Sequence, residues 1–367
     1  MSSRPLAAVV LAAGEGTRMR SERPKPLHLL CGRPMVVHVL DALAEIDVDR
    51  VVVVVGHGAE QVSKHVQAAA PPELALEFVE QRVQRGTGDA VSVALTGFGP
   101  EDELEDGDIL VLPGDTPLLR PPTIAALVRS HRQSGAAATL LTALIDDPTG
   151  YGRVVRAKDD RVLRVVEEAD ADAEERQIRE VNTSIYCFRK SVVAPALRRI
   201  TPENTQGEYY LTDIVEVLAD AGYHVTSMVA EDPIETAGVN DRAQLAVAEA
   251  ELRSRTNERW MRRGVTMVDP EHTYVDVGVE LAPDVTLFPG TILRGATVVG
   301  AGAEIGPNTH LVDTVVGERA VVHSTVARQA TIGADARVGP FSSLDPGAMV
   351  PAGTVTGAHY QGGGGLA

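Results

Sequence analysis

The sequence predicts an α/β domain with a mostly parallel sheet, followed by a long helix and a short β-helix. Short apolar runs alternate with helical patterns from residue 6 to about 230, and this alternation is typical of parallel strands with helices on both faces. Further along the chain aliphatic residues recur every six positions, a period that fits neither a helix nor a strand hairpin. The two periods therefore predict two domains, which is also the expectation for a chain of 367 residues.

Three apolar runs rich in β-branched residues predict buried strands of the first domain at 7–13, 51–56 and 108–115. Helical spacing of apolar residues predicts helices at 35–46, 59–70 and 122–133. The result is an open, Rossmann-like sheet, and ligands of such sheets bind beyond the carboxyl ends of the strands. The loop 14–25 and Asp115 both lie at such ends.

The linker between the domains is predicted to be helical, because residues 241–262 contain neither glycine nor proline. The last residues, TGAHYQGGGGLA, have no apolar pattern and are expected to be mobile. We therefore place the first domain at 1–240, the linker helix at 241–265, the β-helix at 266–355 and a flexible tail at 356–367.

The six-residue period marks the inward-facing positions of the predicted β-helix, in which each hexapeptide forms one face of a coil. A β-sandwich with many loops is the alternative that this pattern leaves open. The aliphatic positions are Leu281, Leu287, Leu293, Val299, Ile305 and Leu311, and after a short slip Val326, Ile332, Val338, Leu344 and Val350.

The composition excludes several classes of partner. Acidic residues outnumber basic ones by 51 to 34, and only 4% of residues are aromatic, so the chain lacks the basic face that nucleic acid or an anionic membrane requires. Two cysteines, Cys31 and Cys187, fit a reducing compartment better than a disulfide scaffold. The apolar start leads straight into a glycine loop, so we expect a buried strand rather than a signal peptide, and a cytoplasmic protein.

A basic cluster in the first loop is the exception to this acidic composition. In LAAGEGTRMRSERPKPL (11–27) two glycines precede three arginines and a lysine, which predicts a small ligand that carries phosphate groups. The loop lacks the end of a Walker P-loop, and Met19 stands where a dinucleotide fingerprint needs its third glycine. A simple strand-to-helix turn with solvated arginines is a further alternative. The order L-A-A-G-x-G-T-R-M followed by P-K resembles the sugar nucleotidyltransferases, whose loop wraps a nucleoside triphosphate.

Further motifs narrow the resemblance to one family. EQRVQRGTGDA (80–90), PGDTPLL (113–119), DDPTGYGRVVR (146–156), EVNTSIY (180–186), NTQGEYYLTDI (204–214) and GVNDRAQL (238–245) occur in order. From residue 6 to about 350 the chain is similar to the bacterial bifunctional UDP-N-acetylglucosamine pyrophosphorylase/glucosamine-1-phosphate N-acetyltransferase family. The resemblance implies a left-handed β-helix that packs as a homotrimer. It also implies that the first domain joins a nucleoside triphosphate, UTP favoured, to a sugar 1-phosphate, N-acetylglucosamine 1-phosphate favoured, and releases pyrophosphate.

The same resemblance implies roles for particular residues. Arg18 and Lys25 are the expected catalytic residues, which hold the departing pyrophosphate and the phosphates at the reacting centre. Asp115 and Asn240 correspond to the ligands of a Mg²⁺ ion. His28 and His57 belong to no Cys/His set with metal spacing and are expected to be ordinary polar residues. The nucleotide is expected to bind Leu11, Ala12, Ala13, Gly14, Gln81, Gln84, Gly86 and Thr87, and the sugar phosphate Gly152, Glu167 and Asn182.

The sequence departs from the family at positions that bear on the substrate and on the second activity. Asp89 replaces a histidine and Ser184 a glycine, which leaves open a secondary-metabolism paralogue with another sugar or cyclitol 1-phosphate and another base, such as a valienol-1-phosphate guanylyltransferase. Ser343 and Asp345 stand where the family carries arginines, and the sequence ends soon after them, so we expect acetyltransferase activity to be absent. A non-catalytic nucleotide-sugar sensor is the alternative from another class.

Overall fold

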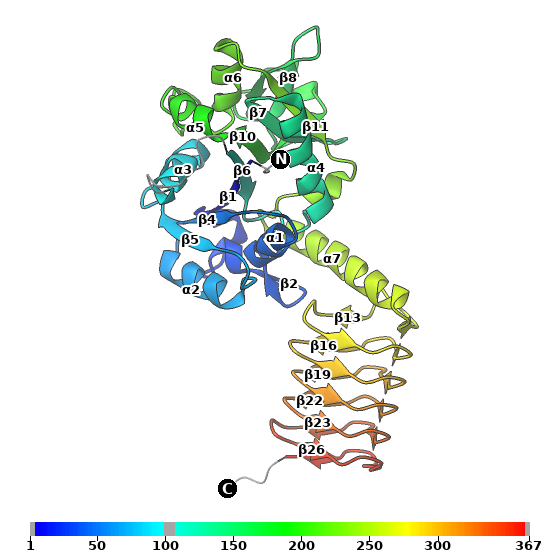
Figure 1. Cartoon of the computed structure of the whole chain (residues 1–367). Helices are drawn as coiled ribbons and strands as arrows, with labels where there is room; N and C mark the ends of the chain where they lie inside the picture. The colour runs from blue at the N-terminus through cyan, green and yellow to red at the C-terminus, as the bar shows by residue number, and fades with distance from the viewer. Residues whose placement is uncertain (1–3, 99–106, 364–367) are drawn as a thin grey trace. The chain divides into compact units, whose positions relative to one another are not determined.

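The computed structural model describes residues 4–98 and 107–363, which form two compact units (Figure 1). The first unit comprises residues up to His28 together with Pro34–Leu245, and the second comprises Leu29–Arg33 and the residues from Ala246 onward. The boundary falls within the first turns of helix α7 (Arg242–Arg262). Among the described residues, no helix combines the length and the apolar character that a membrane span needs.

A sheet of nine strands, counted over the described residues, forms the centre of the first unit. The strands are β1 (Leu6–Ala12), β4 (Arg50–Val55), β5 (Leu76–Glu80), β6 (Asp108–Pro113), β7 (Ala138–Leu144), β8 (Arg153–Arg156), β9 (Val162–Val166), β10 (Glu180–Arg189) and β11 (Val225–Val229). The main path runs β11-β7-β10-β6-β1-β4-β5, and β6, β1, β4 and β5 are parallel. The carboxyl ends of these four strands therefore meet at one edge.

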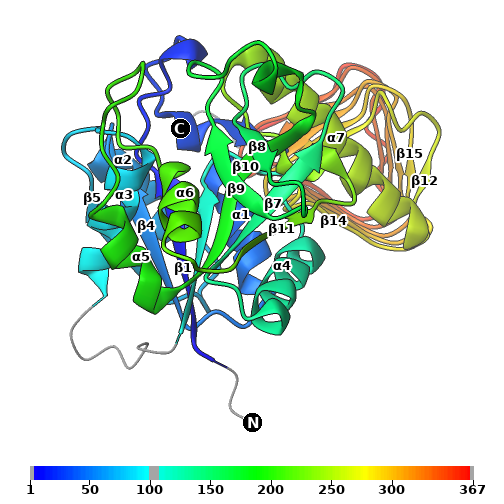
Figure 2. The same cartoon turned by 90° about the horizontal axis from the view of Figure 1, so that it is seen from above.

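Helices cover both faces of this sheet (Figure 2). They are α1 (Met35–Ala44), α2 (Ala59–Ala69), α3 (Thr87–Ala94), α4 (Pro121–Ser134), α5 (Lys190–Leu197) and α6 (Asp213–Asp220). Apolar residues of α1, α2 and α4 share one buried cluster with the sheet, and those of α3, α5 and α6 share another. Val51 and Val53 of β4 belong to the first cluster and Val52 and Val54 to the second, as the pleat of a strand requires.

The predicted strands and helices of this unit are confirmed, with ends shifted by one or two positions. The antiparallel strand β10 is an element that the sequence did not indicate. It pairs with β6 on one side and β7 on the other, and β8 and β9 extend from it as a small antiparallel pair. Because β10 is buried on both faces, its apolar run gives no sign of its direction.

The second unit is a parallel β-helix built on three sheets, so the β-sandwich alternative is wrong (Figure 1). Each short strand pairs in parallel with the strand one coil later. The sheets contain β12 (Thr266–Met267), β15 (Thr286–Leu287), β18 (Glu304–Ile305), β21 (Val321–Val322) and β24 (Arg337–Val338); β13 (Tyr274–Val275), β16 (Ile292–Arg294), β19 (His310–Val312), β22 (Val326–Arg328), β25 (Ser343–Leu344) and β27 (Gln361–Gly362); and β14 (Glu280–Leu281), β17 (Val298–Val299), β20 (Val315–Val316), β23 (Thr331–Ile332) and β26 (Met349–Val350).

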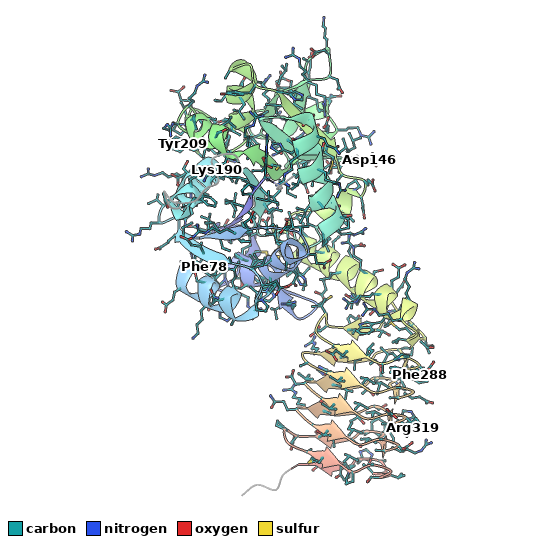
Figure 3. All side chains as sticks on the ribbon, viewed as in Figure 1. Phe78, Asp146, Lys190, Tyr209, Phe288 and Arg319 are labelled. Carbon is teal, nitrogen blue, oxygen red and sulfur yellow. The ribbon has the colours of Figure 1, made fainter. Side chains whose placement is uncertain are left out.

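Side chains of the β-helix alternate between its interior and its surface (Figure 3). Leu287, Ile305 and Val322 of one sheet stack inside, each at 0% exposure. Arg319 lies on the surface at a corner and donates from Nε to Asp335 Oδ1 at 2.8 Å, which links it to the next coil (Figure 3). The β-helix thus combines an apolar interior with polar contacts between coils at its surface.

The predicted position of Val326 was wrong. Val326 is 46% exposed, and Ala327 takes the interior position beneath Leu311. The cause is a shortened coil: Ile292 pairs with His310 and His310 with Val326, so the second of these coils is shorter than the first. The missing residues are lost at the corners, between the strands. Counting back six positions from Ile332 therefore gives Val326, whereas Ala327 is the residue that lies inside.

The predicted boundary of the flexible tail at residue 356 is also wrong for the described residues. Residues 356–363 continue the β-helix, because β27 pairs with β25 and Thr356 N donates to Arg337 O at 3.0 Å. His359 N likewise donates to Pro340 O at 2.9 Å. This segment lacks an aliphatic interior residue, which is why the sequence pattern did not show it; the rest of the predicted tail, 364–367, lies outside the described part of the chain.

Candidate active site

A cavity of about 820 Å³ opens at the edge where the carboxyl ends of β1, β5 and β6 meet. Its wall includes every residue for which the sequence predicts a role, although these residues come from distant parts of the chain. They are Leu11, Ala12, Ala13, Gly14, Arg18, Lys25, Gln81, Gln84, Gly86, Thr87, Asp115, Gly152, Glu167, Asn182 and Asn240. All of them belong to the first unit.

The loop after β1 is shaped by two glycines. Gly16 has φ of 66°, and a β-carbon there would lie 2.6 Å from the β-carbon of Lys25, so glycine allows the loop to pack against the lysine. Gly14 has open space in place of a side chain, which leaves its backbone accessible from the cavity. The short helix η1 (Thr17–Met19) then carries Arg18, and η2 (Lys25–Leu27) begins at Lys25.

Lys25 is surrounded by oxygen atoms of the two predicted metal ligands. Its Nζ atom forms an ion pair with Asp115 Oδ2 and donates a hydrogen bond of 2.8 Å to Asn240 Oδ1. Arg18 Nη2 donates to the same Asn240 oxygen at 3.0 Å. The side chains of Lys25 and Asp115 are only 13% and 25% exposed, so their charges interact largely away from bulk water. Two cations and two oxygen ligands therefore share one wall of the cavity.

Backbone hydrogen bonds hold Asp115 and Asn240 near each other. Gly114 N donates to Leu11 O at 2.8 Å, which ties the loop after β6 to the end of β1. Val239 N donates to Asp115 O at 2.9 Å, which brings the segment before Asn240 against the same loop. The two side chains are thus positioned by backbone contacts that do not depend on a ligand.

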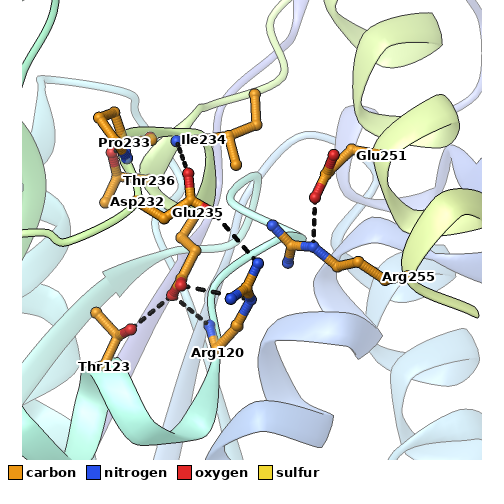
Figure 4. Close-up of polar contacts among 9 residues, drawn as sticks. All are labelled: Arg120, Thr123, Asp232, Pro233, Ile234, Glu235, Thr236, Glu251 and Arg255. Carbon is orange, nitrogen blue, oxygen red and sulfur yellow. Dashed lines mark hydrogen bonds and ion pairs between the residues drawn. The ribbon is translucent and has the colours of Figure 1, made fainter. Parts of the chain in front are cut away.

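The helix η6 (Pro233–Thr236), which leads into this segment, is fixed by a buried carboxylate (Figure 4). Glu235 Oε2 accepts hydrogen bonds from Thr123 Oγ1 at 2.6 Å and from the backbone N of Arg120 at 3.3 Å. The Arg120 guanidinium pairs with Glu235 and also with Asp232, at 3.4 and 3.2 Å. Charge-assisted bonds of this kind are strong, so they anchor the chain shortly before Asn240.

Gln81 also lines the cavity, directly after β5, and is only 3% exposed. Its Nε2 atom donates to Asp89 Oδ2 at 2.8 Å and to Gly86 O at 3.2 Å. Its backbone oxygen accepts from Gln84 Nε2 at 3.4 Å. Asp89 itself is not on the cavity wall, and its hydrogen bond with Gln81 connects it to a residue that is.

Gly86 and Thr87 connect the cavity wall near Gln81 to the segment before α6. Gly86 has φ of 108°, and a β-carbon there would lie 2.5 Å from Tyr209 O. Thr87 Oγ1 accepts a hydrogen bond of 2.9 Å from Leu211 N. The glycine is therefore required by close backbone packing, and the threonine hydroxyl positions the neighbouring segment.

Glu167 and Asn182 place two polar groups at a third part of the cavity wall. Burial raises the pKa of the Glu167 carboxyl above its ordinary value, although the hydroxyl of Thr212, which donates to Oε1 at 2.9 Å, acts in the opposite direction. Asn182 is 4% exposed, and its Nδ2 atom donates to the hydroxyl of Tyr186 at 2.7 Å. Within the described residues nothing donates to Asn182 Oδ1, so a residue of the cavity wall has a buried acceptor without a partner.

Ser184, two positions beyond Asn182, has a backbone conformation that favours glycine. Its φ is 60°, at an irregularity in the pairing of β10 with β7 between Asn182 and Ile185. A side chain in the left-handed region is uncommon and costs conformational energy. Ser184 lines the cavity, so the serine adds a hydroxyl beside Asn182 where glycine would leave space.

The acidic surroundings of Glu167 make the protein's stability depend on pH. Burial, together with the charges of Glu167, Glu216 and Asp170, raises the pKa of Asp213 to about 6. A carboxyl whose pKa is higher in the folded than in the unfolded state stabilises the fold at low pH, and this contribution is lost as the pH rises from about 4 to about 6.

We expect Asp213→Asn to raise the free energy of unfolding by about 2 kcal/mol at pH 7.5, with a gain that shrinks toward pH 4. Urea unfolding at both pH values measures the difference. The matched control is Asp47→Asn, an exposed residue after α1, which should change stability by less than about 0.5 kcal/mol at either pH. A gain that did not vary with pH would contradict this explanation.

The donor atoms around Asp115 fit a Mg²⁺ ion. Two side-chain oxygens, a carboxylate and an amide, already surround the positive charge of Lys25. Gly238 leaves room beside them, because a β-carbon there would lie 3.7 Å from Asn240 Nδ2 and 3.9 Å from Asp115 Oδ1. Residues 4–98 and 107–363 contain no group of three or more His, Cys, Asp or Glu side chains that could hold a metal ion. Few protein ligands are the usual arrangement for Mg²⁺, which takes its other ligands from phosphates and water.

The structure also places residues that the sequence did not single out. Tyr151, Thr236 and Gly238 line the cavity. The first flanks Gly152 and the others precede Asn240, so proximity to a predicted residue is the signal that could have found them. His28 and His57 do not line the cavity.

Comparison with known proteins finds relatives along most of the chain. A family model described as a MobA-like NTP transferase domain matches residues 8–189. A protein of Thermobifida fusca named bifunctional protein GlmU is 47% identical over 332 residues, which is 90% of this chain and 68% of that protein. The proteins of the same name from Desulfitobacterium hafniense and Streptomyces avermitilis are 46% and 45% identical, over 94% and 98% of this chain and 73% of each relative.

Proposed function

This chain belongs to the GlmU family and is a sugar-1-phosphate nucleotidyltransferase, and we propose that it joins UTP to N-acetylglucosamine 1-phosphate. In the proposed reaction, an oxygen of the sugar 1-phosphate attacks the α-phosphorus of UTP. A P–O bond forms there, the bond from this phosphorus to the β-phosphate oxygen breaks, and pyrophosphate leaves with the electron pair. The products are UDP-N-acetylglucosamine and pyrophosphate.

The observation that carries this proposal is the cluster of Lys25, Arg18, Asp115 and Asn240 on one wall of the cavity. Two phosphate-bearing substrates repel each other, so the main task of the protein is to position them and neutralise their charge. Lys25 would contact the phosphates at the reacting centre, and Arg18 would hold the departing pyrophosphate. Both side chains start from hydrogen bonds that phosphate oxygens can replace.

Asp115 and Asn240 would hold a Mg²⁺ ion in this proposal. When bound, such an ion neutralises charge on the phosphates and orients their oxygens. The protein prepares this arrangement through the backbone contacts that place both side chains against the end of β6. Lys25 lies between the two ligands, so its ammonium group has to turn toward the phosphates when the ion binds.

The sugar 1-phosphate would bind beside Glu167, Gly152 and Asn182. The unpartnered Oδ1 of Asn182 can accept a hydrogen bond from a sugar hydroxyl or from the amide N–H of an acetamido group. Glu167 Oε2 lies 3.3 Å from where a β-carbon of Gly152 would be, so glycine at this position leaves the carboxylate accessible. A small polar ligand is favoured because several polar groups converge there.

A pyrophosphate-release assay over a grid of nucleoside triphosphates and sugar 1-phosphates tests this proposal. We expect the highest kcat/KM for UTP with N-acetylglucosamine 1-phosphate. Preference for GTP with a cyclitol 1-phosphate, without turnover of UTP and N-acetylglucosamine 1-phosphate, would instead support the secondary-metabolism alternative that the positions of Asp89 and Ser184 leave open.

We further propose that the β-helix serves assembly into a homotrimer and does not transfer acetyl groups. Ser343 and Asp345 stand where the resemblance implies arginines, so an acetyltransferase site would lack the basic residues that the family uses there. We expect no release of CoA thiol from acetyl-CoA and glucosamine 1-phosphate, and a trimeric mass by light scattering. A thiol signal that persisted in Lys25→Ala would assign acetyl transfer to the β-helix and overturn this proposal.

A further inference from the structure

The hydrogen bond between Gln81 and Asp89 points to a determinant of base selectivity outside the cavity wall. We propose that Asp89 fixes the orientation of the Gln81 side-chain amide, and that this orientation selects nucleotide bases that carry a ring N–H group. Asp89 is then a positioning residue, which acts on the base through Gln81. The inference deepens the proposed function and rests on it, because it takes the cavity to be a nucleoside triphosphate site.

Both hydrogens of the Gln81 amide are used by acceptors that belong to the protein itself. Nε2 donates to Asp89 Oδ2 at 2.8 Å and to the backbone oxygen of Gly86 at 3.2 Å. Among the described residues nothing donates to Gln81 Oε1. The side chain is 3% exposed and lines the cavity. What Gln81 offers a ligand is therefore an acceptor.

The opposite orientation of the amide would be strongly disfavoured. A flip of the amide would place Oε1 against Asp89 Oδ2 and Gly86 O, so that three acceptors would face one another without a hydrogen. An ionised carboxylate can only accept, and water is nearly excluded from Gln81. The hydrogen bond with Asp89 therefore identifies the amide atom that faces Asp89 as Nε2, and the other atom as Oε1.

The two acceptors of the Gln81 amide lie at the start of α3. Asp89 is in the first turn of this helix, where the helix dipole interacts favourably with negative charge. Gly86, which supplies the second acceptor, immediately precedes the same helix and is held by packing against Tyr209. The two acceptors are thus fixed by one element, and the amide is held between them and the cavity.

If Gln81 Oε1 is a fixed acceptor that faces the base, it discriminates between bases by whether a ring nitrogen carries a hydrogen. Uracil carries a hydrogen on N3 and guanine on N1, and either N–H can donate to Gln81 Oε1. Cytosine N3 and adenine N1 are themselves acceptors and would face Oε1 without a hydrogen. The site is therefore expected to take uracil or guanine nucleotides and to reject cytosine and adenine nucleotides.

The ratio of UTP to CTP affinity isolates this effect, because the two nucleotides have the same ribose and triphosphate. We would measure dissociation constants of UTP, GTP, CTP and ATP by calorimetry for the full chain and its variants. The wild-type protein should bind UTP at least about 10²-fold more tightly than CTP. Asp89→Asn replaces an obligatory acceptor by a group that can also donate, so both amide orientations become populated and the ratio should fall at least about tenfold.

Two further variants separate positioning from a structural effect. In Gln81→Ala the ratio should already be low, and adding Asp89→Asn should not lower it further, since Asp89 acts only through Gln81. Asp159→Asn removes the same charge from an exposed turn between β8 and β9 and should leave the ratio unchanged. Should Asp89→Asn fail to fold, which thermal unfolding would show, Asp89→Ala provides the same comparison by removing the acceptor.

The outcomes distinguish this inference from the proposed function. If the selectivity for UTP over CTP survives Asp89→Asn and Asp89→Ala, the role of Asp89 is overturned. The same holds if Asp89→Asn lowers the selectivity by the same factor in the wild-type protein and in Gln81→Ala. Both outcomes leave the proposed function in place. Wild-type preference for CTP or ATP would overturn the inference and the choice of UTP. Absence of binding to all four nucleotides would overturn both.

Discussion

Lys25→Ala is expected to lower kcat/KM by about 10²-fold or more, the usual loss for one positioned electrostatic donor. The ammonium group lies against Asp115 and Asn240 at the cavity wall and is mostly shielded from bulk water. The loss should appear mainly in kcat, because a group that stabilises charge at the reacting centre acts more strongly in the transition state than in the substrate complex. Steady-state kinetics with the preferred substrate pair measures both parameters.

The matched control for this variant is Arg23→Ala. Arg23 belongs to the same basic segment but is exposed and does not line the cavity. Its removal should change kcat/KM by less than about threefold at physiological ionic strength, as expected for a screened surface charge. Equal losses in the two variants would show that the basic segment acts as a diffuse steering patch rather than through one positioned lysine.

Asp115→Ala is expected to have the larger effect, a loss of about 10³-fold in kcat/KM. The variant removes a proposed Mg²⁺ ligand and also the carboxylate that holds Lys25 in place. A readout that does not depend on turnover is Mn²⁺ binding in the presence of UTP, followed by electron paramagnetic resonance. We expect weaker Mn²⁺ binding in Asp115→Ala. The selectivity for UTP over CTP should be unchanged, because other residues, Gln81 among them, are proposed to contact the base.

The control for Asp115→Ala is Asp146→Ala, which removes an exposed carboxylate paired with Arg179 (Figure 3). It should leave kcat/KM and Mn²⁺ binding within about twofold of the wild-type values. Pyrophosphate release by the wild-type chain that disappears in Asp115→Ala excludes the non-catalytic sensor. Binding of UTP without any pyrophosphate release would support the sensor instead.

Local patterns were sufficient to predict most of the fold. The run of valines in β4 predicts a buried strand, and the glycine loop after β1 predicts a ligand-binding loop. Both predictions are possible because each feature is determined by residues that are close together in the sequence. The position of Val326 was wrong because the length of a coil is set at its corners, where residues can be lost while the interior stays filled. The direction of β10 was not predictable either, since a strand buried on both faces has the same pattern in either direction.

The candidate site depends on contacts that the sequence alone does not predict. Resemblance to the family placed Lys25 and Asn240 in one site, although they are 215 residues apart in sequence, but it gave no reason for their contact. That reason lies in the Val239–Asp115 backbone hydrogen bond and in the buried Glu235 that fixes η6. The link from Asp89 to Gln81 could not be predicted, because it depends on how the first turn of α3 packs against the end of β5.

The unequal coils of the β-helix have a consequence for how this part of the gene can change length. Glu304 pairs with Val321 and Val321 with Arg337, so consecutive coils on one sheet differ in length without loss of pairing. Small insertions or deletions are therefore tolerable at the exposed positions of the corners, as long as the buried positions stay filled. A larger change preserves the stacking only if it adds or removes a whole coil, because each coil contacts only its neighbours. Duplication and loss of gene segments that encode one complete coil are thus the mutations by which this unit can grow or shrink over evolutionary time.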